Sequence, residues 1–223
     1  GRGFGPLQPH ILDQYHHPLS PEMSIITANM GNQESRTTAK PAGAFWHSDQ
    51  SYMADPSDGI CLYASHVPSD GGDTMVANTQ LAYDALSDAM KKRIAGLIGI
   101  HRYGYRGGGA ITNLNEDQKK KTPDVEHPVV RTHPITGKKI LFVNPGFTMS
   151  IKGMEPSESD ALLNELFEHE LNPAFIYRHK WSLRQLVILD NRSSMHCAVA
   201  GYREPMRKLR MIIGCTDASK MAA

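Results

Sequence analysis

The chain is dominated by short runs of β-branched and aromatic residues that end at Gly, Pro, Asn or Asp. Four runs stand out, at residues 59–67, 138–144, 186–191 and 209–215. Runs of this kind predict β-strands. They do not alternate regularly with helical segments, which argues against a doubly wound parallel sheet. We therefore expect a mainly β protein with flanking helices, arranged as a double-stranded β-helix (jelly roll).

Two segments have apolar residues at helical spacing. The first can be capped by Asn78 or Thr79 and ends near Gly96 or Gly99. Its apolar positions are Leu86, Met90, Ile94 and Leu97. The pattern predicts one helix over this segment.

The second helical segment begins at Ser157, which makes a capping-box pattern with Asp160. The pair Asn172-Pro173 stops it. Its apolar face consists of Leu162, Leu163, Leu166 and Phe167. We expect both helices to pack outside the strands.

The segment 103–128 is Gly-rich, then polar and basic, with little periodicity. We interpret it as a loop, with 119–121 (Lys-Lys-Lys) as a solvated stretch. A loop this long in a compact domain is usually a functional lid or disordered. It is our lid candidate.

Composition excludes several classes of protein. A length of 223 residues suits one large domain. A formal net charge of +1 gives no general attraction to nucleic acid or anionic lipid. Cys61, Cys197 and Cys215 are odd in number and form no CxxC, so neither a disulfide framework nor a zinc knuckle is indicated. Reduced thiols fit a cytoplasmic protein, and no apolar run is long enough to span a bilayer.

His47-Ser48-Asp49 is the one His-x-Asp/Glu tripeptide in the chain. In a strand, residues i and i+2 point to the same face, so His47 and Asp49 can converge. His196 follows an apolar strand and can supply a third ligand. Two imidazoles and one carboxylate form the facial triad of non-haem Fe(II) oxygenases. A histidine beside a strand is more often structural, however, so the residues alone leave both interpretations open.

Several motifs occur together and in order: WHSDQSY, VPSDGGDTMVANTQLAYDALSDAMK and WSLRQLVILDNRSSMH, with an arginine eleven residues past the last histidine. In these motifs the chain resembles the taurine dioxygenase family of Fe(II)- and 2-oxoglutarate-dependent oxygenases. That family also includes phenoxyacetate-herbicide dioxygenases and alkylsulfatases. The resemblance extends over most of the chain, from FGPL at Phe4 to the strand after Arg207.

The resemblance implies that His47, Asp49 and His196 bind Fe(II). It also implies that the distal carboxylate of 2-oxoglutarate is held by Thr74, in the GGDT turn, and by Arg207. A guanidinium can hold a carboxylate with two parallel hydrogen bonds, and a hydroxyl adds one more donor.

The substrate side departs from the family pattern. Members that act on acidic substrates often carry a second arginine four residues after the first, where this chain has Met211. The nearby cation is Arg210, which a regular strand would direct away from Arg207 unless a bulge intervened. Arg210 is therefore either a substrate-anion residue or solvent-facing. Phe147 matches a position that often lines the substrate pocket, the alternative being core packing, and Gly43 replaces an asparagine of taurine-type enzymes.

The resemblance implies a 2-oxoglutarate-dependent dioxygenase that uses O2 to hydroxylate a small, anionic organic substrate, with succinate and CO2 as co-products. Two alternatives remain: a non-catalytic jelly roll that binds a small anion, and a zinc hydrolase that uses the same ligands. Family chains often form dimers or tetramers, so a homo-oligomer is expected by analogy alone. Family chains also carry several tens of residues before FGPL. We therefore expect a single domain over residues 1–223 that lacks the family's N-terminal segment.

Overall fold

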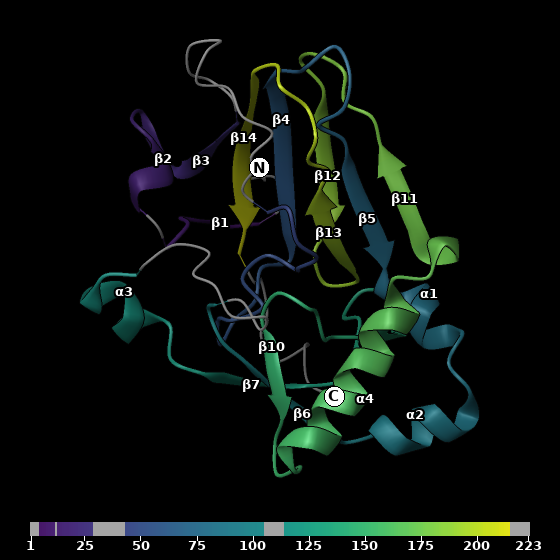
Figure 1. The fold of residues 1–223 in the computed structure, drawn as a ribbon. Coiled ribbons are helices and arrows are strands. Elements are labelled where there is room, and N and C mark those ends of the chain that lie inside the picture. Colours follow the sequence, from purple (N-terminus) through teal and green to yellow (C-terminus); the bar gives the residue numbers. More distant parts are fainter. Residues whose placement is uncertain (1–4, 12, 29–42, 105–113, 215–223) are drawn as a thin grey trace.

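The computed structural model describes residues 5–11, 13–28, 43–104 and 114–214, and its largest element is a six-stranded antiparallel sheet (Figure 1). Its strand order is β12-β4-β14-β3-β2, and β1 also pairs with β14. The strands are β1 (Leu7–Gln8), β2 (His16–His17), β3 (Ser20–Ala28), β4 (Gly59–His66), β12 (Leu186–Asp190) and β14 (Met206–Ile213). A short 3-10 helix, η2 (Asp13–Tyr15), precedes β2.

A second, three-stranded sheet has the order β11-β5-β13 and is also antiparallel. Its strands are β5 (Thr74–Asn78), β11 (Ile176–His179) and β13 (Ser194–Ala198). A hydrogen bond links the two sheets: Lys208 on β14 donates to the Thr74 hydroxyl on β5. A buried hydrophobic cluster built largely from β4 and β14 consists of Ile60, Leu62, Ala64, Trp181, Tyr202, Met206 and Ile212. Two facing antiparallel sheets form the jelly roll that the sequence predicts.

The helices gather at one end of the jelly roll, together with two small sheets (Figure 1). The helices are α1 (Thr79–Asp84), α2 (Asp88–Ile94) and α4 (Pro156–Glu170), with η4 (Pro173–Phe175) after α4. The sheets are β10-β6-β7 and β8-β9, formed by β6 (Ile98–His101), β7 (Val125–Pro128), β8 (Val130–Thr132), β9 (Lys139–Leu141) and β10 (Thr148–Ile151). A second buried core lies between these elements: Ala82, Leu86, Ile94, Val129, Leu141, Val143, Ile151, Leu162, Leu163, Leu166 and Phe167.

The predicted strands are confirmed with shifted ends. β4 and β12 agree with the runs 59–67 and 186–191 to within one residue. β9 covers only three residues of the run 138–144, and β14 starts three residues before 209. Cys61 and Cys197 are buried free thiols, while Cys215 lies outside the described residues. Within the described part of the chain, no helix combines the length and apolar character that crossing a membrane requires.

The predicted first helix is wrong as a single element, because the chain forms α1 and α2 instead. Asn78 caps α1 by accepting from the backbone N–H groups of residues 80 and 81. Ser87 then caps α2 by accepting from Met90 N, so a fresh helix start interrupts the apolar pattern. The chain leaves the helix before Gly96, which has a positive φ of 75°.

Two further expectations are wrong in detail. The capping box of Ser157 does not form, because α4 begins at Pro156 and has no side-chain cap at Glu155. The 119–121 stretch lies at the end of α3 (Glu116–Lys121) rather than in a loop, although its side chains are exposed. Asn115 and Gln118 form a capping box that starts this helix. Residues 105–113 of the lid candidate lie outside the described residues, so the lid role stays a prediction.

Substitutions in the core between α4 and the small sheets test how these elements pack. Leu166 is fully buried, and its truncation to alanine removes apolar contacts and leaves a cavity. We expect Leu166→Ala to lower the free energy of unfolding by about 2–5 kcal/mol in urea denaturation. Leu183→Ala, at a position 61% exposed, should change it by less than about 0.5 kcal/mol. Equal effects of the two substitutions would contradict the assigned core.

Candidate metal centre and cavity

His47 and His196 are brought together by backbone pairing. The two residues form an isolated antiparallel bridge, with His47 N donating to His196 O at 3.0 Å and His196 N donating to His47 O at 2.8 Å. The imidazole rings lie 4.4 Å apart between centroids. His47 Nδ1 donates to Phe45 O at 2.8 Å, because a carbonyl can only accept. His47 Nε2 is therefore the nitrogen with a lone pair, and it lies 3.7 Å from Asp49 Oδ1.

Asp49 reaches the cluster from a turn rather than from a strand. Only His47 makes a strand-like bridge, and the chain turns at Asp49 and Gln50, where Gln50 has a φ of 58°. The expected convergence is present, but strand alternation is not its cause. Asn191 holds this turn, since its side chain accepts from Asp49 N at 2.9 Å and donates to Asp49 O at 2.8 Å.

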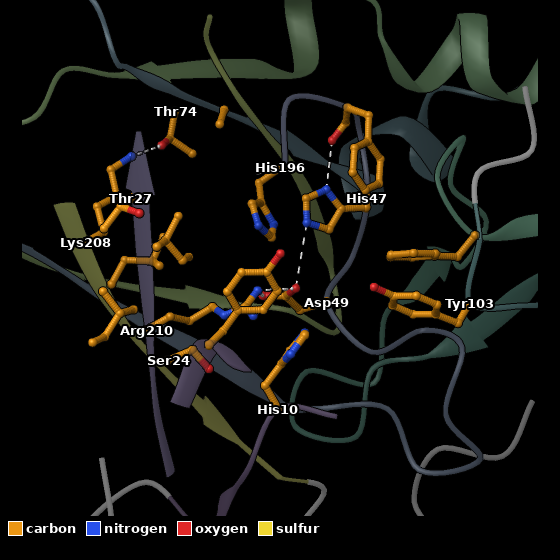
Figure 2. A pocket seen from close by; sticks show the side chains of 18 of the residues that line it. His10, Ser24, Thr27, His47, Asp49, Thr74, Tyr103, His196, Lys208 and Arg210 are labelled. Atoms are coloured by element: carbon orange, nitrogen blue, oxygen red, sulfur yellow. Dashed lines mark hydrogen bonds and ion pairs between the residues drawn. The ribbon is translucent and has the colours of Figure 1, made fainter. Parts of the chain in front are cut away.

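The Asp49 carboxylate is paired with Arg210. Arg210 Nη1 donates to both carboxylate oxygens, at 2.9 and 3.1 Å (Figure 2). Burial alone would raise the pKa of Asp49, but Arg210 and the nearby histidines outweigh it and hold that pKa below its usual range. Burial lowers the pKa of His47, and burial together with His47 lowers the pKa of His196 to about 3. At neutral pH the cluster is thus two neutral imidazoles and one carboxylate, the forms that bind metal ions.

The three side chains fit a metal ion. Their ligand atoms lie within 4.8 Å of one another, and all three residues are buried. His196 Nδ1 is buried and has no hydrogen-bond partner among the described residues, so the protein alone does not satisfy the cluster. Two nitrogen ligands and one oxygen ligand on one side of an ion are the donor set of the facial triad.

A cavity of about 190 Å³ opens at this cluster. Phe147 lies in its wall, 4% exposed, with its ring edge-on to His47 at 5.8 Å between centroids. Tyr52 and Tyr103 extend the aromatic wall, and their rings lie 4.8 Å apart. Arg210 also lines the cavity. Both predicted substrate residues, Phe147 and Arg210, therefore face the same space.

Thr74 lies at the Lys208 end of the cavity, away from Tyr103 (Figure 2). Its hydroxyl accepts from Trp181 Nε1 at 3.0 Å and from Lys208 Nζ at 3.1 Å. Lys208 lines the cavity and is 6% exposed. This end therefore has a hydroxyl and an ammonium group next to each other.

Arg207 is described in the structure but does not line the cavity. β14 pairs with β3 in unbroken register from Met206 to Met211, so Arg207 and Arg210 keep opposite faces. The pairing with β4 does shift between Arg207 and Lys208, but the extra residue is Ser65 on β4. The bulge leaves the alternation of β14 unchanged, and Lys208 and Arg210 face inward.

Three further residues shape this site, and no sequence pattern predicted them: Asn191, Gly146 and Lys208. A Cβ atom at Gly146 would lie 2.7 Å from the Phe45 ring and 3.0 Å from His47 Cβ, so only glycine lets the chain approach this closely. The glycine in VNPGF was a visible signal. The contacts of Asn191 and Lys208 span more than 130 residues and had no local signal.

A jelly roll with two histidines and one carboxylate around a cavity defines the class of non-haem Fe(II) oxygenases. Residues 1–216 match the family described as "Taurine catabolism dioxygenase TauD, TfdA family". The match covers nearly the whole chain, and the chain belongs to this family.

Known relatives and solved structures support this family assignment. The alpha-ketoglutarate-dependent 2,4-dichlorophenoxyacetate dioxygenase of Burkholderia sp. is 36% identical over 157 residues, covering 70% of this chain and 52% of that protein. The alpha-ketoglutarate-dependent sulfonate dioxygenase of Saccharomyces cerevisiae is 32% identical over 223 residues, covering 93% and 51%. A crystal structure of a taurine dioxygenase from Burkholderia xenovorans matches with a TM-score of 0.76 at 30% identity, covering 95% and 68%. The chain spans about half the length of these two curated relatives.

Both curated relatives are named for their dependence on alpha-ketoglutarate, which is 2-oxoglutarate. The names describe those relatives, and the cluster of His47, Asp49 and His196 is the candidate metal site of this chain.

Asn191 provides a test of how the Asp49 turn is held. Asn191→Ala removes the partners of Asp49 N and Asp49 O, and each orphaned buried group costs about 1–3 kcal/mol. We expect lower stability in urea and about 10- to 100-fold weaker metal binding in a Mn(II) titration.

The matched control is Asn172→Ala, which removes the cap of η4. It should cost about 1 kcal/mol of stability and leave Mn(II) affinity unchanged. Equal Mn(II) affinities for the Asn191 variant and the unmodified protein would show that Asn191 does not position Asp49.

Proposed function

We propose that this chain catalyses the Fe(II)- and 2-oxoglutarate-dependent hydroxylation of a small anionic organic substrate, with succinate and CO2 as co-products. The single observation that supports this most is the convergence of His47, Asp49 and His196 in the wall of a cavity that Thr74 also lines. Membership of the dioxygenase family supports the same reaction class.

Fe(II) would be held by His47 Nε2, the Asp49 carboxylate and His196. When bound, it would supply the activation of O2 in a reaction that converts substrate, 2-oxoglutarate and O2 into hydroxylated substrate, succinate and CO2. Three protein ligands leave room on the ion for other ligands. The buried, aromatic wall of Phe147, Tyr52 and Tyr103 would exclude water from the reacting groups.

The co-substrate would lie between the metal centre and Thr74, with its distal carboxylate at the Thr74 hydroxyl. The resemblance assigned the accompanying cation to Arg207, and that assignment stays a prediction. The positive charge on the cavity face of β14 comes from Lys208 and Arg210.

The substrate would bind on the Arg210 side of the centre. The relatives are named for a phenoxyacetate and for sulfonates, and both kinds of molecule are anions. Arg210 Nε is buried without a hydrogen-bond partner among the described residues, and the same holds for the hydroxyl of its cross-strand neighbour Ser24. Both residues line the cavity, so a guanidinium N–H and a hydroxyl could meet a sulfonate or carboxylate. Phe147 would pack against the organic part of the substrate.

Loss of one metal ligand tests the proposed centre. We expect the anaerobic protein with Fe(II) and 2-oxoglutarate to show a weak visible charge-transfer band, and His196→Ala to abolish it. His66→Ala, an exposed histidine on β4, should retain the band. An unchanged band in His196→Ala would contradict this ligand set, and no band in the unmodified protein would contradict the function.

The substrate class is tested by substrate-dependent succinate formation. Because Arg210 supplies positive charge at the cavity, we expect sulfonates, sulfate esters or aryloxyalkanoates to stimulate succinate release. Neutral amides of the same size should stimulate it at least about tenfold less, since a charge-assisted hydrogen bond is lost. Equal stimulation by amide and acid would contradict an anionic substrate.

A further inference from the structure

His133 is a buried histidine outside the metal centre, and both of its ring nitrogens are in use. It follows β8 directly and is 3% exposed. Its Nδ1 accepts hydrogen bonds from the backbone N–H groups of residues 135 and 136, each at 3.2 Å. Because a nitrogen that accepts carries no proton, Nε2 is the protonated nitrogen, and it donates to Asp190 Oδ2 at 3.0 Å. His133 therefore has no lone pair left to act as a base or a metal ligand.

Asp190 connects His133 to the turn between β12 and β13. It ends β12, and its carboxylate also accepts from the backbone N–H and the guanidinium of Arg192, at 2.8 to 3.1 Å. Burial alone would raise the pKa of Asp190, but the hydrogen bonds from Arg192 and His133 outweigh it and hold that pKa below its usual range. The ionised carboxylate thus ties the β12–β13 turn to the turn between β8 and β9.

The turn that Asp190 opens carries two parts of the metal centre. The next residue, Asn191, accepts from Asp49 N at 2.9 Å and donates to Asp49 O at 2.8 Å. β13 then begins at Ser194 and carries His196. A displacement of Asp190 would therefore move the support of the carboxylate ligand and one of the two imidazoles together.

A second hydrogen-bonded path runs from Asp190 to the same centre. Asp190 O accepts from Ser194 Oγ at 2.6 Å, and Ser194 O accepts from Ser48 Oγ at 2.9 Å. Ser48 is the residue between His47 and Asp49. Asp190 is thus connected to the ligand segment twice, through the side chain of the residue that follows it and through its own backbone carbonyl.

We propose that His133 is a positioning residue for the metal centre and acts through Asp190. The strands on either side of its turn, β8 and β9, pair with each other, and the buried core at the helical end contains Val129 and Leu141 from this hairpin. The hairpin therefore gives Asp190 a fixed support. This inference rests on the proposed function, because it assigns a residue that holds the metal ligands of that function in place.

Two substitutions separate positioning from a purely structural role. His133→Asn keeps an acceptor that can cap the turn at residues 135 and 136, but its side chain is too short to reach Asp190. His133→Gln places an amide N–H near the position of Nε2 and can still donate to Asp190, but it loses the acceptor in the turn.

The measurement is the dissociation constant of Mn(II) from the intact protein, followed by the EPR signal of the free ion. We expect His133→Asn to weaken Mn(II) binding about 5- to 30-fold, because it breaks the contact through which the turn is held. His133→Gln should stay within about twofold of the unmodified protein. Each variant loses part of the hydrogen bonding of His133, so both should be less stable in urea, and the difference in affinity then reports on the contact with Asp190.

Asp190→Ala supplies a second, independent measurement. If His133 acts through Asp190, adding His133→Asn to Asp190→Ala should weaken Mn(II) binding no further. The control is His169→Ala on α4, which removes a part-buried histidine whose Nε2 donates to Ala82 O. It should leave Mn(II) affinity unchanged.

Three results would overturn the role of His133. These are an unchanged Mn(II) affinity in His133→Asn, weaker binding in His133→Gln than in His133→Asn, and effects of His133→Asn and Asp190→Ala that multiply. In each case the unmodified protein still binds Mn(II), and the proposed function stands. If the unmodified protein binds no Mn(II), the proposed metal centre fails, and this inference fails with it.

Discussion

The backbone bridge between His47 and His196 is the contact on which the rest of the site depends. It joins two segments about 150 residues apart and sets both imidazoles on one side of the cavity. The turn that follows His47 then carries Asp49 back toward them, and Asn191 holds that turn by its backbone. Without the bridge, His196 would not lie beside His47 and Asp49.

Two cationic side chains line the cavity, and each has its own polar partner. Arg210 lies on the Asp49 carboxylate, and Lys208 lies on the Thr74 hydroxyl, with both cations on the inner face of β14. A buried ion pair is weak evidence for stability, because desolvation offsets much of the Coulomb attraction. Positive charge in a closed space is instead well suited to anionic ligands. Lys208 and Arg210 lie two residues apart on one face of β14, so both present positive charge to the same cavity.

Local sequence patterns predicted the strands and the jelly roll because strand propensity and turn residues act over short distances. They also showed that Arg207 and Arg210 face opposite ways, since alternation along a strand is a local property. They could not show which of the two faces inward, because that depends on the register of β14 with β3 and β4. The split between α1 and α2 was missed because Ser87 can sit within an apolar pattern and still start a new helix. Asn191 was missed because its partners lie in a distant turn.

We expect one metal ion to bind between His47, Asp49 and His196. The most direct measurement is a crystal structure of the protein soaked with Mn(II), with the ion located by its anomalous scattering. We expect a single strong peak in contact with His47 Nε2, an Asp49 carboxylate oxygen and a His196 nitrogen. A peak elsewhere, or Arg210 still holding both Asp49 oxygens with no ion between the histidines, would contradict it.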